Sequence, residues 1–142
     1  MSKPTESQFD QVINGYLACL LWVAPGDEDD ENPGDGTSVH ELSYRVRLIA
    51  AMDCQAFIEA CGSLFDEAVD ERGYSPSSFG HDFALTRNGH GAGFWDRSEL
   101  KDGGLGDKLS ALCGFGTRFK ENNLYKGDDG RFHFEGGASC AS

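Results

Sequence analysis

Residues 81–97 read HDFALTRNGHGAGFWDR, and this stretch concentrates histidine, paired charges, glycine and tryptophan more densely than any other part of the chain. Residues 83–87 read as a strand, and Asn88-Gly89 is a dipeptide typical of a type I′ turn. The sequence therefore predicts an antiparallel hairpin whose strands, at 83–87 and 90–96, are joined by this turn.

A two-residue turn sets the register of this predicted hairpin. Phe83 then faces Phe94, and Arg87 faces His90. We expect the aromatic residues to anchor the hairpin in the core. The alternating glycines leave the other face nearly bare at the tip, so that a helix or a ligand could approach its backbone closely.

Helices are predicted on both sides of this stretch. Residues 5–8 and 38–41 each have the spacing of a capping box, in which a Ser or Thr is followed three residues later by Gln or Glu. Apolar residues then recur at the helical period over 9–21 and over 46–65. A shorter helical pattern covers 105–113 and is stopped by glycines.

A second hairpin is predicted near the end of the chain. Residues 123–126 and 131–134 flank Gly127-Asp128-Asp129-Gly130, a turn sequence. The predicted fold is therefore α+β, with two longer N-terminal helices and a short C-terminal helix packed on a small antiparallel sheet built from two β-hairpins. A chain of 142 residues has the usual size of one domain, and we expect 1–142 to form one.

Asp53 is the unusual member of the second predicted helix. At 100° per residue it lies in the middle of the apolar stripe, where an isolated carboxylate would cost several kcal/mol. Two partners are open to it: backbone N–H groups of the 81–97 hairpin, or an ion pair with Arg87, His81 or His90.

Residues 25–37 form an acidic segment of proline, glycine and like charges, so we expect an exposed loop. The EF-hand spacing is absent, which disfavours a calcium site. The loop is either a solvated connector or a negatively charged surface that faces a basic partner. We expect a flexible tail at 136–142. The acidic residues that would face the partner are Asp27, Glu28, Asp29, Asp30 and Glu31.

The composition restricts the classes of partner. Asp and Glu outnumber Lys and Arg by 24 to 12, which gives a net charge of −12. Such a charge opposes binding to nucleic-acid phosphates and to anionic membranes. The five cysteines are an odd number without a CxxC pair, which favours reduced thiols inside a cell. No signal peptide or membrane-spanning run is apparent in the sequence.

The 81–97 stretch contains residues suited to a site. Histidine and carboxylate side chains at 81, 82, 90 and 96 could ligate a metal, but no tight ligand spacing is present. The polar tip at 87–91 could hold an anion or another small ligand. A serine or cysteine nucleophile near the histidines lacks any local signature. The candidate binding residues are Asp53, His81, Asp82, Arg87, Asn88, His90, Trp95 and Asp96.

A structural interpretation competes with these sites. The charges and aromatic residues of the stretch could simply lock it to the helices. In that case the chain needs neither a metal nor a cofactor, and no catalytic residue is assigned.

The run GHDFALTRNGHGAGFWDR at 80–97 resembles a family of small proteins encoded by tailed bacteriophages and prophages. The likeness extends to Ala18-Cys19-Leu20-Leu21-Trp22, to Asp53-Cys54-Gln55-Ala56-Phe57 and to 124–130. The chain departs from the family pattern at Ala84, where a bulky aromatic residue is usual, and in its longer segment 98–104. The family is uncharacterised, so the resemblance carries over no catalytic residues.

The resemblance implies a phage-type accessory protein made in the cytoplasm of a bacterial host. The leading hypothesis is a non-enzymatic protein that binds and inhibits a bacterial protein with a basic surface, such as a CRISPR or restriction nuclease. It would not bind nucleic acid or membrane directly. The alternative is a small-ligand- or metal-binding protein or an enzyme with its site on 81–97.

Overall fold

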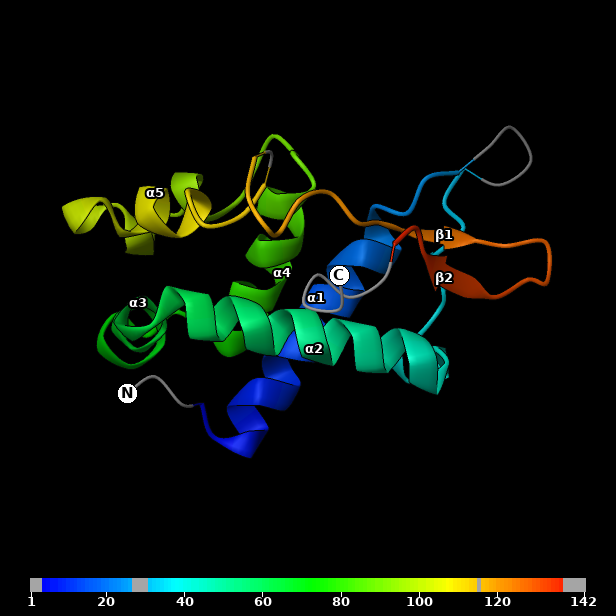
Figure 1. Cartoon of the computed structure of the whole chain (residues 1–142), viewed down its shortest axis with the longest axis horizontal. Helices are drawn as coiled ribbons and strands as arrows, with labels where there is room; N and C mark the ends of the chain where they lie inside the picture. The colour runs from blue at the N-terminus through cyan, green and yellow to red at the C-terminus, as the bar shows by residue number, and fades with distance from the viewer. Residues whose placement is uncertain (1–3, 27–30, 115, 137–142) are drawn as a thin grey trace.

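The computed structural model describes residues 4–26, 31–114 and 116–136. These residues are mostly helical and contain one small antiparallel sheet, which agrees with the predicted α+β class. In Figure 1, α2 lies across α1 and α4, with α5 toward one end of the molecule and the β-hairpin toward the other.

The two predicted N-terminal helices are present, but the second begins later in the chain than its capping box predicts. Helix α1 covers Glu6–Trp22 and begins with the predicted capping box of Thr5. The capping box at Ser38 closes only a 3-10 turn, Val39–Glu41. Helix α2 covers Tyr44–Cys61, because the Ser43 hydroxyl accepts a bond from the Val46 N–H and caps it instead.

Gly62 ends α2 and turns the chain sharply. Its φ of 58° is left-handed, a conformation that glycine adopts without strain. The chain continues in α3 (Ser63–Asp66) and a π-helical turn (Glu67–Glu71), bent by 94° from α2. Within the described ranges, no single helix is long and apolar enough to cross a bilayer, and only this bent pair has the required length and composition.

The hairpin predicted at 83–96 is wrong. Residues 83–87 belong to helix α4, Pro76–Arg87, which begins at the Ser75 cap with Pro76 in its first turn. Asn88 closes this helix, and Gly89 has a left-handed φ of 71°, so Asn-Gly is a helix stop rather than a hairpin turn. Residues 90–96 form a loop and a 3-10 turn, Phe94–Asp96, in place of a strand.

Helix α4 is buried around most of its circumference, which explains the error. Its buried residues come from several faces, so no apolar stripe of helical period stands out in 76–87. The cap at Ser75-Pro76, together with the recurrence of Phe79 and Phe83 four residues apart, was the signal for a helix. The buried residues are Phe79, Gly80, Asp82, Phe83, Ala84, Leu85 and Arg87.

The C-terminal hairpin prediction is confirmed. Strands β1 (Leu124–Lys126) and β2 (Phe132–Phe134) pair antiparallel, with Leu124 opposite Phe134. The predicted short helix is α5, Leu105–Ser110. Two further 3-10 turns, Ser98–Leu100 and Asp102–Gly104, connect it to the rest of the chain.

The core is built around the ring of Phe57 on α2. This ring stacks on Phe83 of α4 with 4.1 Å between centroids, and Phe119 meets it edge-on at 5.5 Å. Phe79 and Phe94 complete the cluster, at 5.6 Å and 5.9 Å from Phe57. Offset and edge-on pairs of this kind add about 0.5–1.5 kcal/mol each beyond their area burial.

Helices α1 and α4 cross with their backbones in contact. Gly15 of α1 faces the Ser77 carbonyl, and Gly80 of α4 faces the Val12 carbonyl. A Cβ atom at either glycine would overlap the opposing carbonyl oxygen. The crossing therefore requires glycine at both positions.

We expect Gly80→Ala to lower the free energy of unfolding by about 3 kcal/mol, because the new methyl group must force the helices apart. The better helix propensity of alanine offsets only about 1 kcal/mol. Urea denaturation measures the change. Gly91→Ala is the matched control, because nothing lies within 4 Å of its Cβ position. Equal stability of the two variants would contradict the close crossing.

Candidate functional site

Asp53 and Arg87 form a buried ion pair at the centre of the molecule. Arg87 Nη1 donates to Asp53 Oδ2 at 2.7 Å, and each side chain is only 1% exposed. The same nitrogen donates to the Tyr16 hydroxyl at 3.1 Å. Of the partners left open for Asp53, the structure therefore shows Arg87.

Arg87 also holds the segment that leads to the sheet. Its Nε and Nη2 atoms both donate to the Lys120 carbonyl oxygen, at 3.0 and 2.6 Å. The guanidinium lies 5.4 Å from the centroid of the Phe83 ring. One side chain thus joins α1, α2, α4 and the segment before β1.

The environment of this cluster disfavours a chemical role. Burial raises the pKa of the Tyr16 hydroxyl and of the neighbouring Cys54 thiol well above their ordinary values. Burial also opposes the charge of Arg87, but its bonds with Tyr16 and Asp53 outweigh that effect and raise its pKa. The cluster therefore combines a buried ion pair with two neutral groups, which is the arrangement of a structural lock.

Asp82 forms a second ion pair, with Arg97. The bond is bidentate: Nε donates to Oδ2 at 2.9 Å and Nη2 donates to Oδ1 at 2.6 Å. Burial raises the pKa of Asp82 in spite of this partner, and the bond to Asp82 raises the pKa of Arg97. Arg97 was absent from the candidate residues, although it closes the 81–97 stretch. Its pairing fastens the turn after 90–93 to α4.

Of the other candidate residues, Asp96 lies beside the second pair, with its Oδ1 3.9 Å from Arg97 Nε. The Asn88 side-chain oxygen accepts from the Asn122 N–H at 2.8 Å. The His90 N–H donates to the Leu85 carbonyl, and the residue is half-buried. Asp96 is exposed and accepts from the Gly93 N–H at 3.0 Å. Trp95 is 46% exposed.

His81 lies on the surface of α4 beside a cavity of about 390 Å³. Its Nδ1 is 3.7 Å from Asp82 Oδ1, and burial together with the nearby Arg97 lowers its pKa. Its ring stacks on Trp22 of α1, with 6.0 Å between centroids. The cavity is lined by Tyr74, Ser77, Ser78, His81, Asp82, Arg97 and Glu99.

One serine of this cavity, Ser78, is engaged by the helix cap. The Ser78 hydroxyl is bonded to the Ser75 hydroxyl at 2.8 Å, as part of the α4 cap. The four cysteines in the described residues are free and buried, and burial raises the pKa of the Cys19 thiol to about 12. A protonated, buried thiol is a poor nucleophile.

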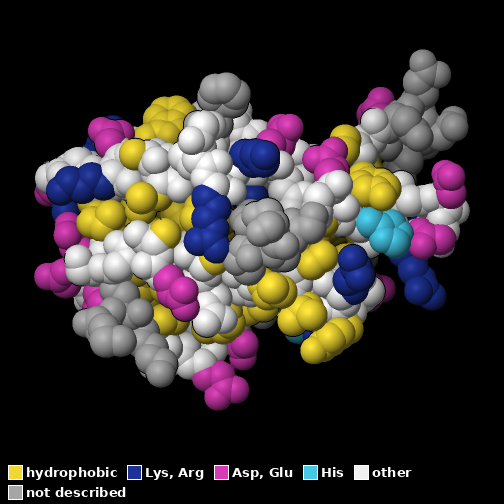
Figure 2. Space-filling view, viewed as in Figure 1, with side chains coloured by type: hydrophobic (Ala, Val, Ile, Leu, Met, Phe, Trp, Pro, Cys, Tyr) yellow, Lys and Arg dark blue, Asp and Glu magenta, His cyan; other side chains and the backbone are white. Residues whose placement is uncertain are grey.

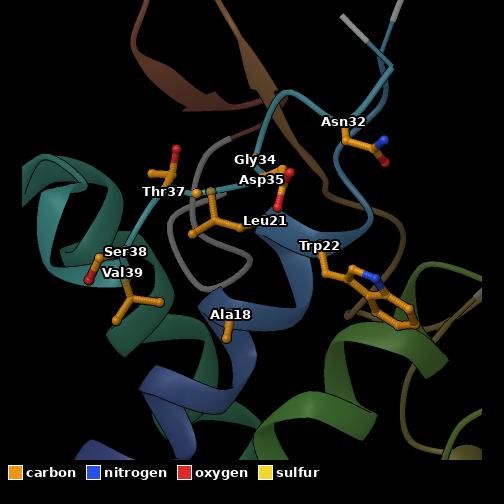
Figure 3. A pocket seen from close by; sticks show the side chains of 10 residues that line it. Ala18, Leu21, Trp22, Asn32, Gly34, Asp35, Thr37, Ser38 and Val39 are labelled. Atoms are coloured by element: carbon orange, nitrogen blue, oxygen red, sulfur yellow. The ribbon is translucent and has the colours of Figure 1, made fainter.

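A larger surface hollow, of about 550 Å³, lies beside the end of α1. It is bounded by the last turns of α1 and by the chain from 32 to 39 (Figure 3). Trp22 stands at its edge and is 71% exposed. This hollow was not predicted from the sequence. The 81–97 stretch does not indicate it, and the apolar pattern of 9–21 does not show that Trp22 is exposed while its neighbours on α1 are buried.

Several predictions fall outside the described residues. Asp27, Glu28, Asp29, Asp30 and the residues from 137 onward belong to this group, whereas Glu31 is described and exposed. Among the residues that the structure describes, no group of three or more His, Cys, Asp or Glu side chains could hold a metal ion.

Comparison of the chain with known proteins gives no match to any family model, curated protein or solved structure. The resemblance to phage proteins therefore stays a prediction from the sequence motif.

We expect Asp53→Asn to lower the free energy of unfolding by about 3 kcal/mol, because it leaves the Arg87 charge buried without a compensating anion. Chemical denaturation followed by circular dichroism measures the loss. Asp129→Asn is the control: its carboxylate pairs with His133 on the exposed hairpin, and the denaturation midpoint should stay nearly constant. A loss below about 1 kcal/mol for Asp53→Asn would contradict the role of the pair.

The Trp22–His81 stack predicts a pH response. Because the pKa of His81 lies below the ordinary value of 6.5, the folded state favours neutral imidazole, and stability from this group is lost as the pH falls below that value. Protonated imidazole quenches a stacked indole. In a Trp95→Phe variant, where Trp22 is the remaining tryptophan, fluorescence should fall with a midpoint below pH 6.5.

His81→Gln supplies the control for this titration, because glutamine keeps a polar side chain without a titrating ring. The fluorescence step should vanish in the His81→Gln/Trp95→Phe protein. A midpoint at or above the ordinary histidine value would show that burial and Arg97 do not favour the neutral ring of His81.

Proposed function

We propose that this protein is a non-enzymatic accessory protein of phage or prophage origin, which acts in the bacterial cytoplasm by binding and inhibiting a host protein. The proposed partner has a basic surface, as the nucleic-acid groove of a CRISPR or restriction nuclease does. The observation that carries the proposal is the distribution of charge over the molecule.

Acidic residues dominate one long part of the chain. Between Arg47 and Arg72 there is no Lys or Arg. Glu59, Asp70 and Glu71 in this interval are exposed. Figure 2 shows acidic side chains around the outline of one face of the molecule, with Lys and Arg side chains nearer its middle. Such a surface attracts a basic partner and repels nucleic acid.

The acidic segment at 27–31 adds to this surface in the proposal. All five of its side chains are carboxylates. We propose that the segment faces the partner, where it raises the rate of association through long-range attraction.

The charges of the 81–97 stretch support the same proposal. Arg87 forms an ion pair with Asp53, and Arg97 forms an ion pair with Asp82. The positive charges that could have held an anionic ligand are therefore largely neutralised inside the molecule. This arrangement favours a structural role for the stretch and leaves recognition to the outer surface.

The alternative is a small-ligand site at the cavity beside His81. Its carboxylate, imidazole and hydroxyl groups could bind a polar molecule, and its volume of about 390 Å³ falls in the usual range for such sites. A ligand held there would depend on His81 and would respond weakly to salt.

Affinity capture from a bacterial lysate, followed by mass spectrometry, tests the proposal. We expect the tagged protein to recover a partner at low salt and to lose most of it as salt is raised, because exposed charges are screened beyond a Debye length. The triple variant Glu59→Gln/Asp70→Asn/Glu71→Gln should recover about tenfold less, if each lost charge contributes about 0.5 kcal/mol.

His90→Ala supplies the control, because it changes the 81–97 stretch without altering the acidic surface. Recovery should stay at the wild-type level. If no partner is captured and a metal or a nucleotide copurifies instead, the proposed function fails and the ligand-binding alternative gains support.

A further inference from the structure

We infer that the hollow beside Trp22 is a docking site for an arginine side chain of the partner. This inference rests on the proposed function and names the surface and the chemistry through which the partner is recognised. The hollow is defined by Ala18, Leu21, Trp22 and Asn32 together with the chain from 34 to 39, and is called the Trp22 hollow below.

Trp22 is exposed yet held in position. It is 71% exposed, although burying a tryptophan is strongly favourable. The ring stacks on His81, and the backbone contacts of Gly15 and Gly80 fix α1 relative to α4. Because the ring is already ordered, a partner would lose little conformational entropy in packing against it. Exposed, ordered tryptophans are characteristic of binding hot spots.

The size and shape of the Trp22 hollow suit a side chain. Its volume of about 550 Å³ lies within the range of sites that enclose small ligands. Figure 3 shows Ala18 and Leu21 on α1, facing the chain that carries Thr37 and Val39, while Trp22 projects away from them over the neighbouring helix. The lining combines the apolar side chains of Ala18, Leu21 and Val39 with polar groups, among them those of Asn32 and Asp35.

The charges around the hollow favour a cation. Among the described residues that line it, Asp35 is the ionisable one, and no Lys or Arg is present. Helix α1 ends here without a basic residue in its last turn, so the partial negative charge at its C-terminus is not offset locally. The outer face of the Trp22 ring adds the negative potential of an aromatic π-system.

Arginine satisfies these three features better than lysine. Its planar guanidinium can stack on an indole ring and can also donate two parallel hydrogen bonds to a carboxylate such as Asp35. An acidic segment would be repelled by the same groups. The chemistry at the hollow therefore matches the basic partner that the overall charge requires.

The second cavity is lined by the other ring of the same aromatic pair. Trp22 lines the hollow, and its stacking partner His81 lines the cavity that also contains Glu99. The arginine of that cavity, Arg97, is already bonded to Asp82. An extended basic segment that reaches both cavities would therefore meet Asp35 in one and Glu99 in the other.

Binding of a labelled, arginine-containing peptide, compared with the same peptide in which citrulline replaces arginine, tests the inference directly. Citrulline has nearly the same shape but no charge. Fluorescence anisotropy should show that the wild-type protein binds the arginine peptide at least about tenfold more tightly. Trp22→Ala should weaken binding by about tenfold, and Asp35→Asn by several-fold.

Tyr44→Ala is the matched control, because Tyr44 is 73% exposed and lies on α2, outside the lining of the hollow. Its affinity for the arginine peptide should stay within about twofold of the wild type. Equal binding of the two peptides, unchanged affinity of Trp22→Ala, or no binding up to about 1 mM peptide would each overturn the docking site.

The lysate experiment separates this inference from the proposed function. If the wild-type protein captures a salt-sensitive partner and Trp22→Ala captures it equally well, the docking site is overturned while the proposed function stands. If no partner is captured but the peptide binds with the expected dependence on Trp22 and Asp35, the proposed function fails and the arginine site stands.

Discussion

The close crossing of α1 and α4 is the constraint on which the rest of the structure depends. Gly15 and Gly80 let two backbones meet where side chains would normally separate them. The crossing brings Tyr16 beside Arg87 on the inside and Trp22 beside His81 on the outside. The buried lock and the exposed aromatic pair are thus two results of one helix contact.

The two ion pairs stabilise different parts of the molecule, one in the core and one nearer the surface. The Asp53–Arg87 pair is fully buried and fixes helices to one another, whereas Asp82–Arg97 fixes an irregular segment to the surface of α4. Both pairs neutralise arginine with aspartate, so neither leaves a strong unbalanced charge inside the protein. The net charge of the chain is consequently carried by its surface.

The features that could be predicted from the sequence are those determined by residues close together in the chain. The Thr5 capping box identified α1, the Gly127–Gly130 turn identified the C-terminal hairpin, and the position of Asp53 in an apolar stripe predicted a buried partner. Helix α4 was not predicted from the sequence, because a helix that is buried on most sides shows no apolar stripe. In addition, Asn88-Gly89 can end a helix as well as form the turn of a hairpin.

The candidate site was harder to foresee for a related reason. Exposure of an aromatic residue depends on which other elements cover it, and no local pattern distinguishes Trp22 from the apolar residues of α1 that lie in the core. Its stacking partner His81 is 59 positions away in the sequence, on a helix that was itself predicted as part of a hairpin. Side-chain clusters made by distant segments are set by tertiary packing, which single-sequence patterns do not encode.

Arg87 also bears on the order in which the chain folds. Its acceptors on Tyr16, Asp53 and Lys120 lie 71, 34 and 33 residues away in the sequence. Long loops must close before any of these bonds can form, and the entropy of closure is lost before the bonds compensate for it. We therefore expect the lock to form late in folding and to act chiefly by slowing unfolding of the native state.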